Sequence, residues 1–326
     1  AGRRRDEPWA TAWVGPRPRS AVAWVGFETS ERDRVSGFKT PEHARASMSP
    51  TRRSLLFTPG DRGDRMRTAP ESGADIVCFD LEDGVAPAKK AEARETVHEV
   101  LSDPAFDPQA EVCVRLTPDA ATDVDVVLDG AVRLDAVQVP KAESAADVTA
   151  VARLLDDAGH PVPVFAMIET ARGVLAADEI AAAEPTAMLC FGAEDLTADL
   201  GAEAGPERRE VAYARQRTLL AARAGDAMAL DTPYVDYGDE SGLRGDAADA
   251  VALGYDGKAA IHPTQVDPIH ESFAPAPERV AWAERVLAAR DEVDGGVATV
   301  DGEMVDAPMF ARAERVLARA GDRDRP

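Results

Sequence analysis

The segment "AMLCFGAED" (residues 187–195) joins a continuous apolar run to two adjacent carboxylates. Its first five residues are of the kind that the interior of a sheet buries, and Glu194 and Asp195 follow directly after a glycine and an alanine. Burying an unpaired carboxylate costs free energy, so these charges must reach solvent, a cation or strong hydrogen-bond donors. The segment therefore predicts a buried strand whose carboxyl end opens on a polar site.

Eight runs of this kind follow one another from Ser54 onward, separated by amphipathic stretches such as residues 145–159 and 208–225. Apolar strands that alternate with helices are typical of parallel β/α units covered on both faces. Eight such units over about 210 residues predict a closed (β/α)8 TIM barrel. The alternative, an open doubly wound sheet, lacks the glycine-rich nucleotide turn that would favour it. The runs are "SLLFTPG" (54–60), "DIVCFDLED" (75–83), "EVCVRLTP" (111–118), "LDAVQVPK" (134–141), "VPVFAMIET" (162–170), "AMLCFGAED" (187–195), "AMALDTPYVD" (227–236) and "GYDGKAAIHP" (254–263).

Two further helices are expected after the eighth strand, at residues 277–292 and 308–320, joined by "DGGVATVDGEMVDAP" (294–308). A closed barrel does not require them. We therefore expect a barrel over residues 51–275 and a C-terminal helical region over residues 276–326 that serves as a lid or an oligomer arm. Gly295, Gly296 and Gly302 are the expected hinges of this lid.

Residues 1–50 are expected to form a disordered N-terminal extension. Residues 1–47 contain nine Lys/Arg and six Asp/Glu, a balance opposite in sign to that of the whole chain, and they show no sustained helical or strand period. Met48 reads like a natural protein start, so the segment is interpreted as translated upstream of the true start. A functional targeting segment is the alternative, although no apolar stretch of ~7–15 residues follows the arginines at 3–5.

The composition excludes several classes of partner. A net charge of −22 with only five lysines repels phosphate backbones, which argues against a nucleic-acid partner. No apolar run approaches the ~18 residues of a membrane span. The cysteines have a spacing that fits neither a zinc site nor a disulfide framework, which predicts buried free thiols in a reducing, cytoplasmic compartment. The acidic, lysine-poor surface further suggests a halophilic protein from a cytoplasm of high salt.

Polar residues gather at the carboxyl ends of the predicted strands, the rim where barrel enzymes build their active sites. Some of them would simply reach water. Glu169 and Asp195, however, end the neighbouring fifth and sixth strands, and two carboxylates that leave positions for water or substrate suit Mg²⁺ or Mn²⁺. Glu82 and Asp83 could fix arginine or backbone donors, and Lys141 could bind phosphate or form a structural ion pair. The whole set is Asp80, Glu82, Asp83, Arg115, Lys141, Glu169, Glu194, Asp195, Asp231 and His262.

Nine segments of the chain, taken in order, resemble the citrate lyase β-subunit-like family, which includes malyl-CoA, β-methylmalyl-CoA and citramalyl-CoA lyases. The resemblance runs from about Arg52 to Ala320. The segments are "RRSLLFTPGDR", "DIVCFDLEDGVAPAKKAEAR", "VRL", "VPKAES", "AMIETARGVL", "FGAEDLTADLG", "YARQRTLLAARAG", "GYDGKAAIHPTQV" and "GEMVDAPM".

The resemblance implies a (β/α)8 barrel with a C-terminal helical extension, assembled as a homotrimer or homohexamer. It implies Mg²⁺ as cofactor, with Glu169 of "IET" and Asp195 of "GAED" as its ligands. Arg115 of "VRL" resembles the guanidinium that meets the oxygens of the oxo acid and thioester. Asp306 of "MVDAP" resembles a catalytic carboxylate that reaches over the active site of a neighbouring subunit. Together with Arg115 and Asp195, the expected contacts to CoA or substrate are Phe57, Arg62, Glu194, Ile261 and His262.

Two positions depart from the family pattern. Members often have Arg-x-Asn in the third strand, where this chain has Thr117, so one donor is lost from the expected pocket floor. A basic residue common near the end of the first helix is replaced by Thr68, with Arg65 and Arg67 as nearby substitutes. These departures bear on substrate preference rather than on reaction class.

The reaction that the resemblance implies is a reversible Claisen-type carbon–carbon cleavage of an acyl-CoA. The leading interpretation is a lyase that converts L-malyl-CoA or β-methylmalyl-CoA into glyoxylate and acetyl-CoA or propionyl-CoA. One alternative is a citrate lyase β subunit, which would cleave a citryl thioester of an acyl carrier protein. The others are a malate synthase-like enzyme, which also hydrolyses the thioester, and a non-catalytic protein that binds CoA or metal.

Overall fold

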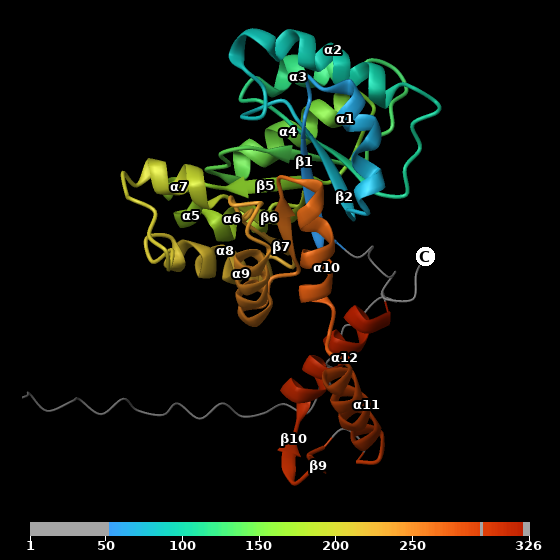
Figure 1. Cartoon of the computed structure of the whole chain (residues 1–326), viewed down its shortest axis with the longest axis vertical. Coiled ribbons are helices and arrows are strands. Elements are labelled where there is room, and N and C mark those ends of the chain that lie inside the picture. The colour runs from blue at the N-terminus through green and yellow to red at the C-terminus, as the bar shows by residue number, and fades with distance from the viewer. Residues whose placement is uncertain (1–51, 294–295, 322–326) are drawn as a thin grey trace, which may run out of the picture. The chain divides into compact units, whose positions relative to one another are not determined.

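The computed structural model describes residues 52–293 and 296–321 (Figure 1). The extension predicted over residues 1–50 lies outside the described residues. No helix in the described ranges is long and apolar enough to cross a membrane.

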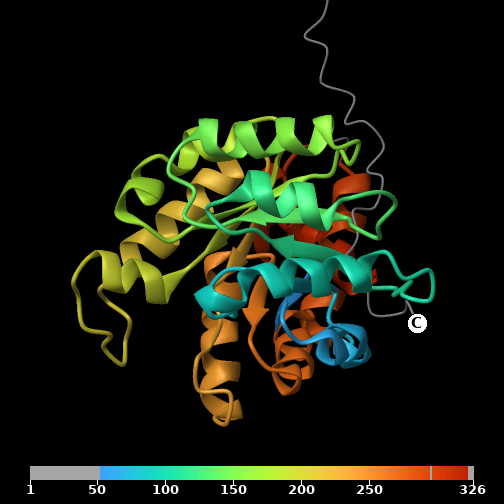
Figure 2. The same cartoon turned by 90° about the horizontal axis from the view of Figure 1, so that it is seen from above.

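Eight parallel strands close into a barrel in which each strand pairs with the next along the chain and β8 returns to β1. This confirms the predicted (β/α)8 fold, and Figure 2 shows helices on the outside of the strands. Because all the strands are parallel, their carboxyl ends meet at one rim. The strands are β1 (Ser54–Pro59), β2 (Ile76–Asp80), β3 (Glu111–Arg115), β4 (Ala136–Val139), β5 (Val164–Ile168), β6 (Thr186–Phe191), β7 (Met228–Asp231) and β8 (Gly257–Ala260).

Helices connect the strands, and several begin at a residue that caps them. Ser144 and Asp147 form a capping box at the start of α4, and the side chain of Asp239 accepts a hydrogen bond from Gly242 at the start of α9. The helices are α1 (Gly63–Thr68), α2 (Lys90–Leu101), α3 (Ala120–Val127), α4 (Ala145–Asp157), α5 (Ala171–Leu175), α6 (Ala177–Ala181), α7 (Ala193–Asp199), α8 (Ala212–Ala224), α9 (Glu240–Leu253) and α10 (Val266–Phe273). Short 3₁₀ turns add η1 (Ala69–Ser72), η2 (Pro87–Lys89) and η3 (Pro263–Gln265).

Two apolar cores result from the alternation of side chains along the strands. The larger core lies between strands and helices, and a smaller one fills the barrel interior with residues such as Leu55, Phe165 and Met188. The three cysteines belong to this interior core and are buried and free, as predicted. They are Cys78, Cys113 and Cys190.

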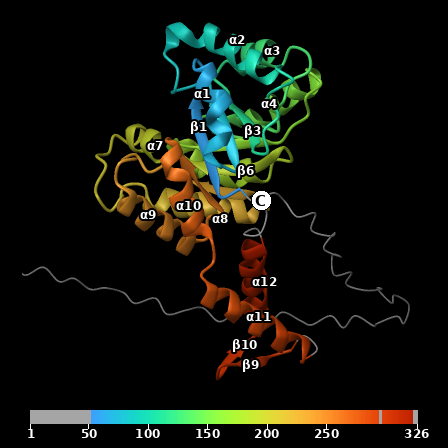
Figure 3. The same cartoon turned by 45° about the vertical axis from the view of Figure 1, so that its right-hand side comes forward.

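The C-terminal region forms a lobe with its own apolar core (Figure 3). It consists of α11 (Pro277–Asp291), the antiparallel strands β9 (Ala298–Val300) and β10 (Glu303–Val305), and α12 (Ala307–Gly321). Asp301 and Gly302 both have positive φ, +53° and +85°, as the two-residue hairpin turn of type I′ requires. Gly302 was predicted as a hinge and lies in this hairpin turn instead, whereas Gly295 is not among the described residues.

The lobe contacts the barrel through the end of α12. The guanidinium of Arg319 donates to the carbonyl of Tyr255 at 3.2 Å and lies 3.7 Å from Asp256. Both partners immediately precede β8, at the amino end of the barrel. This contact is therefore on the side opposite the rim at which the strands end.

A buried ion network joins the seventh and eighth strands to the helices outside them. The ammonium of Lys258 is fully buried and contacts Asp231 at 2.8 Å, the carbonyl of Thr232 at 2.7 Å, and Asp246. Arg215 of α8 donates two hydrogen bonds to Asp231, at 2.8 and 2.6 Å. Buried charges require this kind of complete pairing, so the network fixes where β7 ends.

We expect Lys258→Met to lower the free energy of unfolding by about 3–5 kcal/mol, because it leaves buried carboxylate charge without one of its two cations. Urea denaturation followed by circular dichroism measures this loss. Arg285→Met is the matched control, since Arg285 forms a half-exposed pair with Asp301 and should cost about 0–1 kcal/mol. If Lys258→Met lowers the free energy of unfolding no more than Arg285→Met does, the structural role of the network is contradicted.

Candidate active site

The carboxyl rim of the barrel encloses a cavity of about 310 Å³. Six of the predicted site residues line it, and they come from the carboxyl-terminal parts of four strands and the first turn of α7. They are Phe57, Arg115, Glu169, Glu194, Asp195 and Ile261. Most of the residues predicted for the site therefore lie together at the carboxyl rim, because the ends of parallel strands meet there.

Arg115 is held in a fixed orientation at the floor of this cavity. Its guanidinium donates to both oxygens of Asp80, at 2.7 and 2.5 Å, and lies 3.5 Å from Glu82. Its central carbon lies 4.8 Å from the centre of the Phe57 ring. Burial alone would lower the pKa of Arg115, but the hydrogen bond and the negative charge of Asp80 raise it. The side chain is therefore a permanent, oriented positive charge.

Asp80 also organises the turn after β2, a role that sequence reasoning did not assign. Its two oxygens accept hydrogen bonds from the backbone of Glu82 at 2.8 Å and of Gly84 at 2.7 Å. A Cβ at Gly84 would lie 2.5 Å from an Asp80 oxygen, so glycine is needed there. The acidic run "DLED" is the feature of the sequence that could have indicated this role of Asp80. The prediction that Glu82 fixes an arginine agrees with its contact to Arg115.

Glu169 is a buried carboxylate that accepts few hydrogen bonds from the described residues. Only 1% of the residue is exposed, and one of its oxygens accepts a hydrogen bond from the backbone N–H of Lys141 at 2.8 Å. Burial, opposed in part by this N–H and reinforced by the charge of Asp195, raises the pKa of Glu169 to about 7. A Cβ at Gly192 would lie 2.7 Å from its other oxygen. The glycine of "GAED" therefore makes room for this carboxylate.

Glu169 and Asp195 form a pair that lacks a strong counter-ion among the described residues. The ammonium of Lys141 is 3.8 Å from Asp195, and no described arginine makes an ion pair with either carboxylate. Nor does any described cluster of three His, Cys, Asp or Glu side chains fit a metal ion. Two carboxylates that face one cavity, of which Glu169 has a raised pKa, fit a hard divalent cation that takes its remaining ligands from water or substrate.

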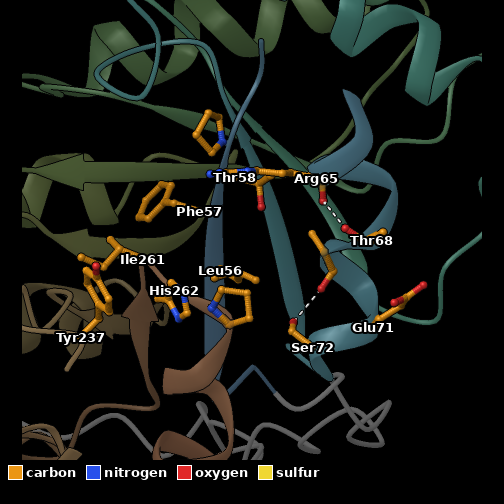
Figure 4. A pocket seen from close by; sticks show the side chains of 13 residues that line it. Leu56, Phe57, Thr58, Arg65, Thr68, Glu71, Ser72, Tyr237, Ile261 and His262 are labelled. Atoms are coloured by element: carbon orange, nitrogen blue, oxygen red, sulfur yellow. Dashed lines mark hydrogen bonds between the residues drawn. The ribbon is translucent and has the colours of Figure 1, made fainter. Parts of the chain in front are cut away.

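A second cavity of about 780 Å³ adjoins the first and shares Phe57, Pro59 and Ile261 with it (Figure 4). His262 lines this second cavity and stacks on Tyr237, with ring centres 4.9 Å apart. The remaining lining mixes apolar groups, hydroxyls and two charges: Leu56, Thr58, Arg65, Thr68, Ala69, Glu71, Ser72 and Pro263. The two cavities together can hold a long ligand whose reactive end lies beside the carboxylate pair.

Three predicted site residues have surroundings that differ from the predicted contacts with substrate or CoA. Arg62 is largely exposed and lies 3.4 Å from Asp61. Glu194 lines the first cavity but accepts a hydrogen bond from Arg208 at 2.6 Å. Asp306 belongs to the C-terminal lobe, where its carbonyl accepts the first hydrogen bonds of α12. The structure of one chain therefore does not bring Asp306 together with the rim.

This fold and rim define the class of the protein, a (β/α)8-barrel enzyme with a carboxylate pair and a buried arginine at the carboxyl ends of its strands. Residues 53–263 match the model of the HpcH/HpaI aldolase/citrate lyase family, and the chain belongs to that family of carbon–carbon lyases.

Named relatives share most of this chain. A citrate lyase subunit beta-like protein of Mycobacterium tuberculosis is 42% identical over 276 residues, 82% of this chain and 95% of that protein. A mitochondrial citramalyl-CoA lyase of Mus musculus is 32% identical over 82% of this chain and 86% of that protein. The solved structure of M. tuberculosis CitE in complex with magnesium, acetoacetate and coenzyme A superposes with a TM-score of 0.71 at 41% identity, covering 82% of this chain and 98% of that one.

We expect Glu169→Gln and Asp195→Asn each to abolish measurable Mg²⁺ binding while the fold is kept, because each removes a ligand charge and nearly preserves shape. Isothermal titration calorimetry measures the binding, and circular dichroism checks the fold. Full Mg²⁺ affinity in either variant would reject that residue as a ligand.

The raised pKa of Glu169 also sets a pH dependence. Since its folded pKa of about 7 exceeds the ordinary 4.5, the protonated form stabilises the metal-free fold below pH 4.5, and this contribution is lost as the pH rises through about 7. A proton competes with the cation, so Mg²⁺ should bind more weakly at pH 6 than at pH 8. Equal affinity at both pH values would contradict this account.

Proposed function

We propose that this protein is a Mg²⁺-dependent lyase that reversibly cleaves L-malyl-CoA or β-methylmalyl-CoA to glyoxylate and acetyl-CoA or propionyl-CoA. The observation that carries the proposal is that a carboxylate pair and an oriented arginine line one cavity, beside a second, larger cavity that shares three lining residues with it. A lyase of this kind must bind a small 2-oxo acid and a thioester side by side, which these two cavities allow.

Glu169 and Asp195 are the proposed ligands of Mg²⁺. The bound ion would act as a Lewis acid that polarises the oxygen of a chelating 2-oxo or 2-hydroxy acid. The relatives support this assignment. Solved structures of M. tuberculosis CitE contain magnesium with acetoacetate or with pyruvate, and one of the citrate lyase beta subunit of M. tuberculosis contains magnesium with oxaloacetate. In this chain, the close approach of Gly192 to Glu169 keeps that carboxylate at the cavity wall.

Arg115 is the proposed stabiliser of the enolate that forms on the thioester carbonyl. Asp80 occupies one edge of the guanidinium with two hydrogen bonds, so the group cannot rotate and is oriented before the reaction begins. Preorganised donors of this kind lower the barrier because they need no rearrangement as charge develops. A lysine could not reproduce the forked geometry.

The second cavity is the proposed path of the CoA thioester arm. Its shared residues Phe57 and Ile261 provide apolar contact next to the reactive end, and Arg65 supplies a positive charge farther along the lining. Arg65 thereby takes the place of the basic residue that Thr68 replaces. The exposed Tyr237 stacks on the half-buried His262, and the two rings offer a flat surface beside this path.

Asp306 is the proposed acid–base group, donated by a neighbouring subunit of a homotrimer or homohexamer. None of the residues that line either rim cavity comes from residues 277–321, and Arg319 ties the end of α12 to the opposite end of the barrel. A lobe from another subunit that closes over bound thioester would exclude water and deliver this carboxylate at the same time.

A second candidate function is that of a citrate lyase β subunit, which would use a thioester of an acyl carrier protein. Relatives with that name are 35% and 36% identical over 82% of this chain. Both functions need the same carboxylate pair and arginine, so the distinction lies in the carrier of the thioester.

A coupled assay of the purified protein should show cleavage of malyl-CoA or β-methylmalyl-CoA that depends on Mg²⁺ and releases glyoxylate. Citramalyl-CoA and a citryl thioester of an acyl carrier protein are assayed in parallel. Preference for the carrier-protein thioester would establish the second candidate instead. Release of free CoA thiol from acetyl-CoA and glyoxylate would reveal a thioester hydrolase, and no turnover of any of these substrates would refute the proposal.

Asp306→Asn should leave Mg²⁺ affinity unchanged and lower turnover by about 10²–10⁴, because the substitution removes only the acid–base group. Mixed oligomers of inactive Asp306→Asn and inactive Glu169→Gln protomers should regain part of the activity. Where the two kinds of protomer meet, one site combines the intact Glu169 of the first with the intact Asp306 of the second. Failure of confirmed mixed oligomers to regain activity would place Asp306 in its own subunit's site.

A further inference from the structure

The lysines in the part of the chain that the structure describes reach the rim of the barrel. Five of its 37 basic residues are lysines, and the four that the structure describes all reach groups that follow the ends of strands. Lys89 contacts Asp61, Lys90 donates to the carbonyl of Leu81, and Lys258 reaches the carbonyl of Thr232. The fourth, Lys141, lies between the carboxylates of the candidate site. An ammonium is thus the cation at these four places, although arginine is the more common basic residue of the chain.

The backbone of Lys141 has an unusual conformation with a direct consequence for the site. Its φ is +47°, in the left-handed region that favours glycine, and it follows Pro140 directly after β4. In this conformation its N–H donates to Glu169 at 2.8 Å. A non-glycine residue in this region carries backbone strain, which points to a role for the side chain of Lys141 that glycine would not supply.

The side chain of Lys141 lies among three carboxylates. Its ammonium is 2.7 Å from Glu82, and 3.8 Å from both Asp83 and Asp195. Glu82 is in turn held by Arg115. One residue therefore connects the arginine side of the site to both carboxylates of the proposed metal pair, through its backbone to Glu169 and through its side chain to Asp195.

We propose that Lys141 is a positioning residue and the resident counter-cation of the metal site. In the metal-free protein its ammonium offsets the charge of the Glu169–Asp195 pair. A divalent cation that binds this pair must replace the interaction between the ammonium and Asp195. Glu82 and Asp83 are already within reach to keep the displaced ammonium paired. The inference rests on the metal site of the proposed function, but it concerns how that site is held ready and not which thioester is cleaved.

This arrangement explains why a lysine is used. A counter-cation must balance the carboxylates without occupying their shared face, and an ammonium is a single compact charge on a flexible stem. A guanidinium would bind a carboxylate through two parallel hydrogen bonds, as Arg115 binds Asp80, and would compete more strongly with the metal.

The test is the Mg²⁺ dissociation constant of the metal-free, substrate-free protein, measured by isothermal titration calorimetry. Lys141→Met should tighten Mg²⁺ binding by about threefold or more, because it removes a positive charge that lies ~4 Å from a ligand. Lys141→Gly should do the same and also relieve the backbone conformation. Lys141→Arg keeps the charge and should not tighten binding. Lys89→Met is the matched control and should leave the constant unchanged, because the half-exposed Lys89 pairs with Asp61 and with neither carboxylate of the proposed metal site.

The midpoint of thermal unfolding provides an independent measurement. Without Mg²⁺ the Met variant should unfold at a lower temperature than the wild-type protein, and saturating Mg²⁺ should raise its midpoint by more than it raises that of the wild type. Unchanged or weaker Mg²⁺ binding in both variants would overturn the counter-cation role while leaving the proposed lyase intact. Absence of Mg²⁺ binding by the wild-type protein would overturn this inference and the proposed metal site together.

Discussion

The ion pair between Arg115 and Asp80 is the interaction on which the rest of the candidate site depends. Asp80 binds the guanidinium with both oxygens and the same two oxygens hold the turn that carries Glu82. Glu82 then pairs with Lys141, whose backbone holds Glu169. Each charged group in this chain of contacts is oriented by the one before it, so its position does not depend on solvent or on a flexible loop.

Periodicity was enough to predict the barrel, because a parallel strand buried on both faces is a nearly continuous apolar run and eight such runs alternate with helices. It was not enough for the C-terminal lobe. β9 and β10 are only three residues each, and the Asp301–Gly302 turn between them lies in a stretch whose glycines suggested a hinge. Short strands give too few residues for a period to be recognised.

The location of the site followed from topology, but the partners of its side chains did not. The ends of parallel strands must meet, so Glu169 and Asp195 could be placed together from the sequence. Whether Lys141 pairs with a carboxylate or remains available for a phosphate depends on where the turns after β2 and β4 lead, and no local pattern records that. For the same reason Asp80 was recognised as a rim residue, but its bond to Arg115 was not predicted.

The distribution of charge connects the composition with the chemistry. A chain of net charge −22 repels the anionic substrates that the proposed reaction requires, so attraction must come from the few cations at the rim and not from the molecule as a whole. Arg115 is buried and permanently charged, whereas Lys141 is partly exposed and has carboxylates on several sides. An arginine that cannot move suits the charge that develops during reaction, and a lysine that can change partners suits a site that must exchange its cation. In the proposed reaction the two basic residues therefore divide two tasks: Arg115 would stabilise the reacting anion, and Lys141 would offset the negative charge of the site before the cation binds.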